Sequence, residues 1–209
     1  MTTQLEAFTN EIIGKLRSRD IPIGISNRHV HLCEKDYQTL FPNEPISISK
    51  MLTQPGHFAS NQSVALIGPK GSIEKVRLLG PLRPKTQVEI SLTNARELGV
   101  HGVIRQSGDL SQTPGIIISS DDGEVKIDEG VIVAKRHIHM STLDALIFGL
   151  KDKQCISVYI GSGARKTRFD QVTVRADPNS RLEMHLDTDE ANAIGLSGKS
   201  DFATILKDG

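Results

Sequence analysis

The chain has 209 residues, which is enough for one large domain or two small ones. Its 25 Lys and Arg balance its 25 Asp and Glu, and this balance excludes a broad charged surface for nucleic acid or an anionic membrane. Aromatic residues make up 4% of the chain and Trp is absent, which argues against a platform for stacking bases.

The first predicted element is an amphipathic helix over residues 3–19, ahead of a closing Pro22. Its apolar positions recur at spacings of three and four: Leu5, Phe8, Ile12 and Leu16. A single short helix is marginally stable in water. It therefore has to pack against its own body or against a partner, and the pattern favours neither.

Strands dominate from residue 21 onward, and Gly, Pro and Asp turns separate many of them. This spacing predicts β-sandwiches or small barrels. Short helices are expected at 34–40, 141–149 and 188–194, the second beginning at Ser141 and the third with an Asp187–Glu190 capping box. The predicted strands are 21–31, 46–52, 63–68, 73–79, 86–92, 102–106, 115–119, 124–127, 130–139, 155–160, 167–176 and 181–186.

Neither the cysteines nor the apolar runs indicate a secreted or membrane protein. Cys33 and Cys155 lie far apart and form no CxxC motif, so no disulfide framework is expected and a reducing cytosol is favoured. Apolar runs are too short for a transmembrane helix, and the N-terminus lacks the apolar core of a signal peptide. We expect no membrane partner and no nucleic-acid partner.

A repeated motif is the most informative feature of the sequence. Arg28-His29-Val30-His31 returns as Arg136-His137-Ile138-His139, with Asp36 and Asp144 at matching offsets beyond it. The spacing from position 28 to position 136 is close to half of the chain, which indicates internal duplication. We predict a mainly β protein with short helices and two β-barrel domains. The expected limits are 1–20 for the helix, 21–115 for domain 1 and 116–209 for domain 2.

Each His-x-His pair is a candidate for binding a metal ion. Residues i and i+2 of a strand share a face, so the two imidazoles of each pair point the same way. Two imidazoles supply half of a tetrahedral zinc shell. The alternative is a pair of surface strands whose polar faces happen to carry histidines.

A third ligand is easier to suggest for the second pair than for the first. His185 lies in a late strand pattern, and three histidines with an open position are typical of a catalytic site. Alone, His185 would be a partly buried strand histidine. Glu89 is the candidate for the first pair, although the local pattern of a lone acid between Val88 and Ile90 favours a solvent-facing side chain.

Several cations lie near these elements and suit an anion such as phosphate. Arg77 and Arg83 flank an apolar Gly-Pro segment, and Lys70 lies in a Gly-Pro-Lys-Gly turn. Taken singly, each of these residues has the pattern of an ordinary cation on the protein surface. The sequence contains no Walker-type or dinucleotide-binding motif.

The chain resembles the PduL-type phosphotransacylases, which are the phosphate propanoyltransferases of bacterial metabolic microcompartments. The resemblance covers residues 21–195 in six ordered blocks. The blocks are IPIGISNRHVHL, LTQPGHFASNQSVALIGPKG, VRLLGPLRPKTQVEIS, SGDLSQTPGI, GVIVAKRHIHMS and RLEMHLDTDEANAIG.

This resemblance implies two zinc ions per chain, bound to two β-barrels of a homodimer. The first zinc would be held by His29, His31 and Glu89, and the second by His137, His139 and His185. Arg83 would bind phosphate and act in catalysis. Contacts to coenzyme A would come from Ile25, Ser26, Asn27, Lys70, Arg77 and Asn192.

The implied reaction converts acyl-CoA and phosphate, with propanoyl-CoA as the name-giving substrate, into acyl phosphate and free CoA. We expect phosphate to attack the thioester directly, although Cys33 lies close enough to His31 that a covalent route needs a test. The first helix is similar to encapsulation peptides, which implies partners in the microcompartment shell or core and a location in its lumen. The rival functions are a metal-dependent hydrolase of thioesters and a protein that uses zinc only structurally.

Overall fold

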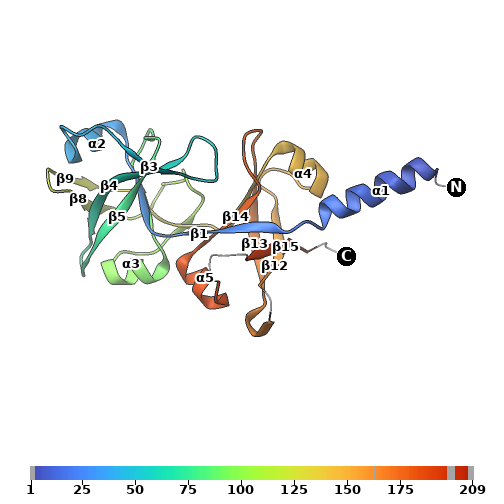
Figure 1. Cartoon of the computed structure of the whole chain (residues 1–209). Coiled ribbons are helices and arrows are strands. Elements are labelled where there is room, and N and C mark those ends of the chain that lie inside the picture. Colours follow the sequence, from blue (N-terminus) through green and yellow to red (C-terminus); the bar gives the residue numbers. More distant parts are fainter. Residues whose placement is uncertain (1–2, 162, 197–200, 207–209) are drawn as a thin grey trace. The chain divides into compact units, whose positions relative to one another are not determined.

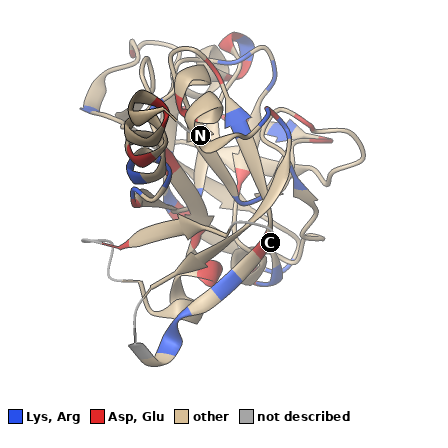
Figure 2. Cartoon of the chain, turned by 90° about the vertical axis from the view of Figure 1, so that its right-hand side faces the viewer, with Lys and Arg blue, Asp and Glu red and all other residues tan. Residues whose placement is uncertain are grey.

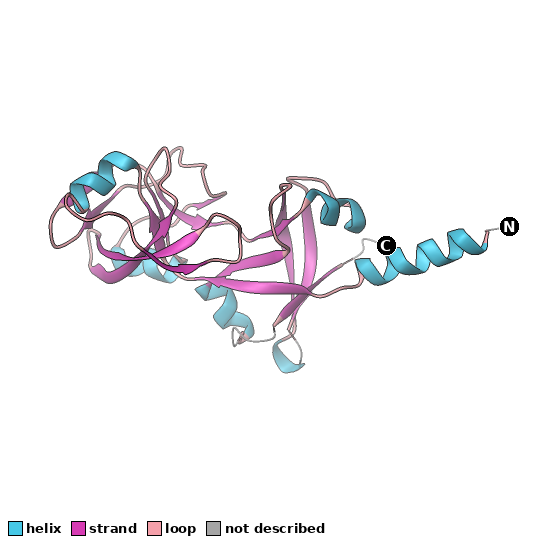
Figure 3. Ribbon diagram, turned by 45° about the horizontal axis from the view of Figure 1, so that its top comes forward, coloured by secondary structure: helices cyan, strands magenta, loops and turns pink. Residues whose placement is uncertain are grey.

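The computed structural model describes residues 3–161, 163–196 and 201–206 (Figure 1). The predicted mainly β fold with short helices and an N-terminal helix is confirmed, and strand residues outnumber helical residues in the described part of the chain (Figure 3). The chain divides into two compact units. One contains residues 1–25, 136–186 and 190–209, and the other contains residues 26–135 and 187–189.

The first helix, α1 (Gln4–Arg17), matches the predicted segment. Thr3 caps its first turn, because its hydroxyl accepts from the backbone of Glu6 while the Glu6 carboxylate accepts from the backbone of Thr3. None of its residues is buried, and Leu5 is 74% exposed. The apolar stripe of α1 is therefore open to solvent. Within the described residues, no helix has the length and apolar character needed to cross a membrane.

The unit that contains the C-terminal half is built on a closed six-stranded barrel, in the order β1-β14-β11-β13-β12-β15. Alternate strand residues such as Ile138, Val158 and Met184 fill its core. Its elements include β1 (Ile21–Ser26), β11 (His137–Met140), α4 (Thr142–Phe148), β12 (Cys155–Ile160), the 3₁₀ turn η1 (Gly163–Arg165), β13 (Thr167–Ala176), β14 (Glu183–Asp187), α5 (Thr188–Ile194) and β15 (Phe202–Ile205).

The other unit is a nine-stranded sheet in the order β7-β10-β6-β2-β5-β4-β8-β9, with β3 paired to β4. Val30, Leu66 and Leu78 are fully buried in its core. Its elements are β2 (His29–His31), α2 (Glu34–Leu40), β3 (Ile48–Met51), β4 (Phe58–Ile67), β5 (Ser72–Gly80), β6 (Gln87–Glu89), α3 (Leu92–Leu98), β7 (Ile104–Arg105), β8 (Ile116–Ser119), β9 (Glu124–Ile127) and β10 (Val131–Ala134).

The duplication is visible in the strand pairing of the two units. In the sheet, β2 pairs in parallel with β5 and antiparallel with β6. In the barrel, β11 pairs in parallel with β13 and antiparallel with β14. The next strand outward is also equivalent, since β4 pairs antiparallel with β5 and β12 pairs antiparallel with β13. A short helix follows each His-x-His strand.

The strand that precedes each His-x-His strand lies in the opposite unit. The predicted strands 21–31 and 130–139 are each broken, into β1 and β2 and into β10 and β11. β1 lies beside β14 in the barrel, whereas β10 pairs in parallel with β6 in the sheet. The compact units do not divide at the expected limits 21–115 and 116–209, because the sheet unit includes β8, β9 and β10 from beyond residue 115 and the barrel unit includes β1 from before it.

Helix α3 is an element that strand patterning did not predict. Ser91 caps it by accepting from the backbone N–H of Asn94, and Gly99 ends it in the left-handed conformation with φ of 75°. The other expected helices are present as α2, α4 and α5. Lys and Arg positions and Asp and Glu positions are both spread over many elements of the chain (Figure 2), in keeping with the balanced composition.

Candidate metal centres

The first candidate centre is formed by two neighbouring strands of the sheet. β2 and β6 run antiparallel with His29 directly opposite Glu89. His31 shares the face of His29 two residues on, and Val30 points into the core. All three side chains are buried, and their ligand atoms lie within 4.8 Å of one another. The register of the strands thus brings together the three residues of the first predicted site.

Backbone carbonyls orient both imidazoles of this first triad. Nδ1 of His29 lies 2.8 Å from the carbonyl oxygen of Asn27, and Nδ1 of His31 lies 3.1 Å from that of Leu79. A carbonyl oxygen only accepts, so Nδ1 of each ring carries the proton and donates it. Each Nε2 then keeps its lone pair, which is the form that binds a metal.

The charges of the first triad are strongly coupled. Burial alone would lower the pKa of His29, but the Glu89 carboxylate, whose Oε2 lies 3.5 Å from His29 Nε2, raises it overall. For Glu89, burial alone would raise the pKa of the carboxyl. The charges of the two imidazoles outweigh burial, so the pKa of Glu89 is lowered overall. Burial, His29 and Arg83 lower the pKa of His31 to about 2. Glu89 is therefore ionised and His31 neutral at neutral pH.

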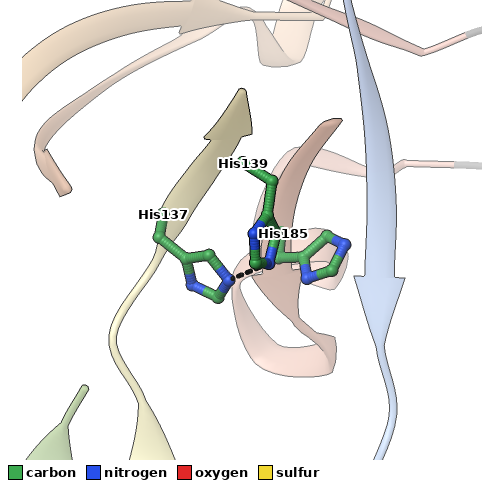
Figure 4. Close-up of side chains that lie close together, drawn as sticks. All are labelled: His137, His139 and His185. Carbon is green, nitrogen blue, oxygen red and sulfur yellow. Dashed lines mark hydrogen bonds between the residues drawn. The ribbon is translucent and has the colours of Figure 1, made fainter. Parts of the chain in front are cut away.

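The second candidate centre lies on two strands of the barrel (Figure 4). β11 and β14 run antiparallel with His137 directly opposite His185, and His139 shares their face. Nε2 of His137 lies 3.1 Å from Nε2 of His139, and the ring of His185 is in edge contact with both. Nε2 of His185 also lies 2.8 Å from a carboxylate oxygen of Glu183. This triad is more open, because His139 and His185 are only half-buried.

Both triads suit zinc by the chemistry of their donors. The first offers two imidazoles and a carboxylate, and the second offers three imidazoles. These are nitrogen and oxygen ligands that zinc prefers, and three protein ligands leave a coordination position for a substrate or water. The equivalent register of His29 with Glu89 and of His137 with His185 means that the two centres are copies of one arrangement.

Arg83 lies next to the first triad, within a polar network that sequence reasoning missed. Its Nη1 donates to the hydroxyl of Ser107 at 2.9 Å, and that hydroxyl donates to Oε1 of Glu89 at 3.0 Å. The positive charge of Arg83 lowers the pKa of both His31 and Glu89. Gln87, two residues before Glu89, also donates to Glu89. No motif marks Gln87 or Ser107, although Gln87 shares a strand face with Glu89.

The residues expected to contact coenzyme A lie at the surface of their own units. Arg77 in β5 is the register partner of His29, and Lys70 lies in the turn between β4 and β5. Ser26 is half-buried. The exposed members are Ile25, Asn27, Lys70, Arg77 and Asn192.

The remaining histidines and the nearby cysteine stand outside both triads. Neither His57 nor His101 belongs to a cluster of potential ligands among the described residues. Cys33 is half-buried at the start of α2, and its backbone N–H donates to the hydroxyl of Thr86. Its position is therefore that of a helix-capping residue.

Comparison with known proteins gives one consistent match. Residues 22–197 match the family described as phosphate propanoyltransferase, and this range includes both triads. The phosphate propanoyltransferase of Citrobacter freundii is 52% identical over 203 residues, covering 97% of each chain. That of Shewanella putrefaciens is 52% identical over 199 residues, covering 95% of this chain and 94% of its own. That of Salmonella typhimurium is 50% identical over 202 residues, covering 97% and 96%.

Proposed function

The chain belongs to the phosphate propanoyltransferase family, and on this premise we propose that it interconverts acyl-CoA plus phosphate with acyl phosphate plus CoA. It is an acyltransferase that uses phosphate. Propanoyl-CoA is the proposed substrate, after the printed name of the relatives. Acetyl-CoA is chemically close, since one methylene changes binding in an apolar pocket by only about 1–3 kcal/mol.

Two zinc ions are the proposed cofactors, one for each triad. His29, His31 and Glu89 would hold the first, and His137, His139 and His185 the second. When bound, zinc supplies a Lewis acid that polarises the thioester carbonyl and stabilises a thiolate leaving group. The convergence of three ligand atoms in each triad supports this assignment.

The first triad is close to the protonation state that a metal requires. Glu89 is ionised and His31 is neutral, so neither has to lose a proton. The raised pKa of His29 reflects the nearby negative charge of Glu89. A bound cation would offset that charge and so favour the neutral form of His29, which is the form that binds a metal.

Arg83 is the proposed phosphate-binding and catalytic residue. A guanidinium donates in a planar fork that matches phosphate oxygens, and it offsets the charge that gathers as phosphate attacks the thioester carbon. The proximity of the Arg83 charge to the first triad supports this role. We propose direct attack by phosphate, without an acyl-enzyme. Ile25, Ser26, Asn27, Lys70, Arg77 and Asn192 are the proposed coenzyme A contacts.

One observation carries the proposal: a family member presents two three-ligand triads, built in the same register on equivalent strands. The test is release of thiol from propanoyl-CoA with and without phosphate, alongside metal analysis of the purified protein. Release should require phosphate and yield propanoyl phosphate. Release without phosphate would instead identify a metal-dependent hydrolase.

Arg83→Ala provides the residue-level test of phosphate binding. The variant should raise the KM for phosphate and lower kcat, by about 10²–10³ if Arg83 stabilises the transition state as a single oxyanion donor does. Arg105→Ala is the matched control, because Arg105 lies in the same unit, on the short strand β7, outside the first triad. Unchanged phosphate kinetics in the Arg83 variant would remove Arg83 from the site.

Helix α1 is the proposed encapsulation segment, placing the enzyme in the lumen of a bacterial microcompartment. Its exposed apolar stripe supports docking on shell or core proteins. Fusion of residues 1–19 to a fluorescent protein should direct that protein into microcompartments, and replacing Leu5 and Phe8 with Ser should abolish the effect.

A homodimer is also proposed, and sedimentation of the purified chain tests it.

A further inference from the structure

A buried polar cluster lies beside Glu89 in the nine-stranded sheet. Gln87 is 1% exposed and sits two residues before Glu89 on the same face of β6. Ser107, from the segment after β7, reaches both side chains. Buried polar groups are costly unless they are hydrogen-bonded. A cluster of this kind therefore depends on each member finding its partners.

The hydroxyl of Ser107 uses its full hydrogen-bonding capacity. A hydroxyl has one proton to donate and two lone pairs to accept with. Ser107 accepts from Nη1 of Arg83 and from Nε2 of Gln87, both at 2.9 Å. Its own proton is then directed to Oε1 of Glu89, at 3.0 Å.

The backbone fixes the orientation of the Gln87 amide. The N–H of Gly108 donates to Oε1 of Gln87 at 2.7 Å, so the amide nitrogen has to face the other way. Its two protons are donated to Oε1 of Glu89, at 2.6 Å, and to Ser107. Gly108 adopts a φ of 98°, a conformation that L side chains rarely adopt.

These contacts give the two carboxylate oxygens of Glu89 different environments. Oε1 accepts from both Gln87 and Ser107. Oε2 lies 3.5 Å from Nε2 of His29, within the triad. Hydrogen bonds to Oε1 thus fix the orientation of the carboxylate, and Oε2 points toward the other two residues of the first triad.

We propose that Gln87 and Ser107 are positioning residues, which hold Glu89 so that Oε2 binds the metal ion and which join this ligand to Arg83. The inference rests on the proposed function, since it assigns the first triad to a metal. Hydrogen bonds to a metal-binding carboxylate fix its direction, and their loss typically weakens metal binding about 10–100-fold.

The test measures zinc affinity at the first triad of the full-length chain. His137→Ala and His185→Ala together disable the second triad, so that competition with a chromogenic chelator reports the first triad alone. Ser107→Thr and Ser107→Val form the decisive pair, because they have nearly the same shape and differ in the hydroxyl. Gln87→Met removes the amide donors at similar volume.

Ser120→Ala is the matched control for general loss of stability. The Ser120 hydroxyl donates to the carbonyl of Leu40 and accepts from the backbone of Gly123, in the same unit and outside the triad. Ser107→Val and Gln87→Met should bind zinc about 10–100-fold more weakly. Ser107→Thr and Ser120→Ala should bind it as the parent does.

If the chain that carries His137→Ala and His185→Ala does not fold, a second measurement uses the chain with both triads intact. Of the two zinc dissociation constants, Ser107→Val should raise one and leave the other unchanged. It should also raise the KM for phosphate, because Arg83 loses an acceptor. Equal zinc affinities for the Thr and Val variants would overturn this inference alone. A folded parent chain that binds no zinc would overturn the proposed function as well.

Discussion

Cys33 and Ser141 occupy the same place in the two halves of the repeat. Each is the N-cap residue of the short helix that follows a His-x-His strand. Ser141 accepts from the backbone of Asp144 and completes a capping box, whereas the Cys33 side chain makes no capping bond. Serine is among the strongest N-cap residues. The first half therefore lacks a local stabilisation that the second half has.

Replacing Cys33 with Ser should stabilise the protein by roughly 0.5–1 kcal/mol, since it supplies the missing cap. Urea denaturation should show a higher midpoint with an unchanged slope. Phosphate-dependent thiol release should continue at the parent rate, because Cys33 belongs to neither triad. A variant that keeps its zinc and loses turnover would instead support a covalent route through Cys33.

Asp144 makes the stability of the barrel unit dependent on pH. Burial acts to raise the pKa of this carboxyl, but hydrogen bonds from Arg19 and Ser141 outweigh burial and lower the pKa. A carboxyl with a lower pKa in the folded state stabilises the fold above its unfolded pKa of about 4. That contribution disappears as the pH falls through the folded pKa.

Comparison with Asp144→Asn isolates this contribution. The free energy of unfolding of the parent should exceed that of the variant by a constant amount between about pH 5 and pH 8. The difference should shrink as the pH falls below about 4. Urea titrations over this range provide the measurement. A difference that grows on acidification would mean that the pKa of Asp144 is raised in the folded protein.

Local sequence identified the histidines of the site more readily than its acid. The spacing of His29 and His31 alone predicts a shared strand face, and the structure agrees. Glu89 between Val88 and Ile90 has the local pattern of a solvent-facing residue, but its side chain is buried. Its burial follows from pairing with β2, a contact between residues far apart in the chain. The local sequence gives no sign of the role of Ser107 either, because its contact with Glu89 also joins residues that are distant in the chain.

At the scale of elements, strand β1 approaches the second triad through a glycine. A Cβ placed on Gly24 would lie 3.1 Å from the ring of His185 and 3.2 Å from the carboxylate of Glu183. Such contacts are tighter than ordinary packing, so at least one of the two side chains would have to shift. β1 thus helps to set the position of His185.

Replacing Gly24 with Ala should weaken zinc binding at the second triad and leave the first unchanged. Chelator competition, with the first triad disabled by His31→Ala, measures this directly. Gly14→Ala in α1 is the matched control, because a Cβ there meets nothing within 4 Å. Unaltered zinc affinity in the Gly24 variant would mean that His185 has room to adjust.

Helix α3 shows where patterning fails for short elements. Its seven residues follow the end of β6 after a gap of two residues, and the alternating apolar residues Val88, Ile90 and Leu92 continue the strand pattern across the boundary. The deciding features are Ser91 and Gly99, which cap the helix at either end. Two capping residues around a short segment are easily outweighed by an alternating apolar pattern.

At the scale of the whole molecule, the repeat predicted two similar halves but not how their strands are exchanged. Both β1 and β10 directly precede a His-x-His strand, and each pairs in the other unit. A repeat in sequence does not specify pairing partners, because the same alternating pattern suits several neighbouring strands. The expected limit between 115 and 116 therefore cannot be derived from the motif alone.

The exchange of strands between the two units predicts which fragments of the chain will fold. Residues 26–135 contain all nine strands of the sheet and the complete first triad. The fragment 21–115 lacks β8, β9 and β10, which removes Ile116, Ile118 and Val131 from the core. It also leaves β6, the strand of Glu89, at an unpaired edge, because β10 is its other neighbour.

We therefore expect the fragment 26–135 to unfold cooperatively and to bind one zinc ion, and the fragment 21–115 to do neither. Circular dichroism melts and metal titration of both purified fragments provide the measurement. The His29→Ala form of the longer fragment should keep its melt and lose its metal, which separates folding from binding. A shorter fragment that melts cooperatively with bound zinc would show that the domain limits follow the sequence repeat, because β8, β9 and β10 would then be dispensable.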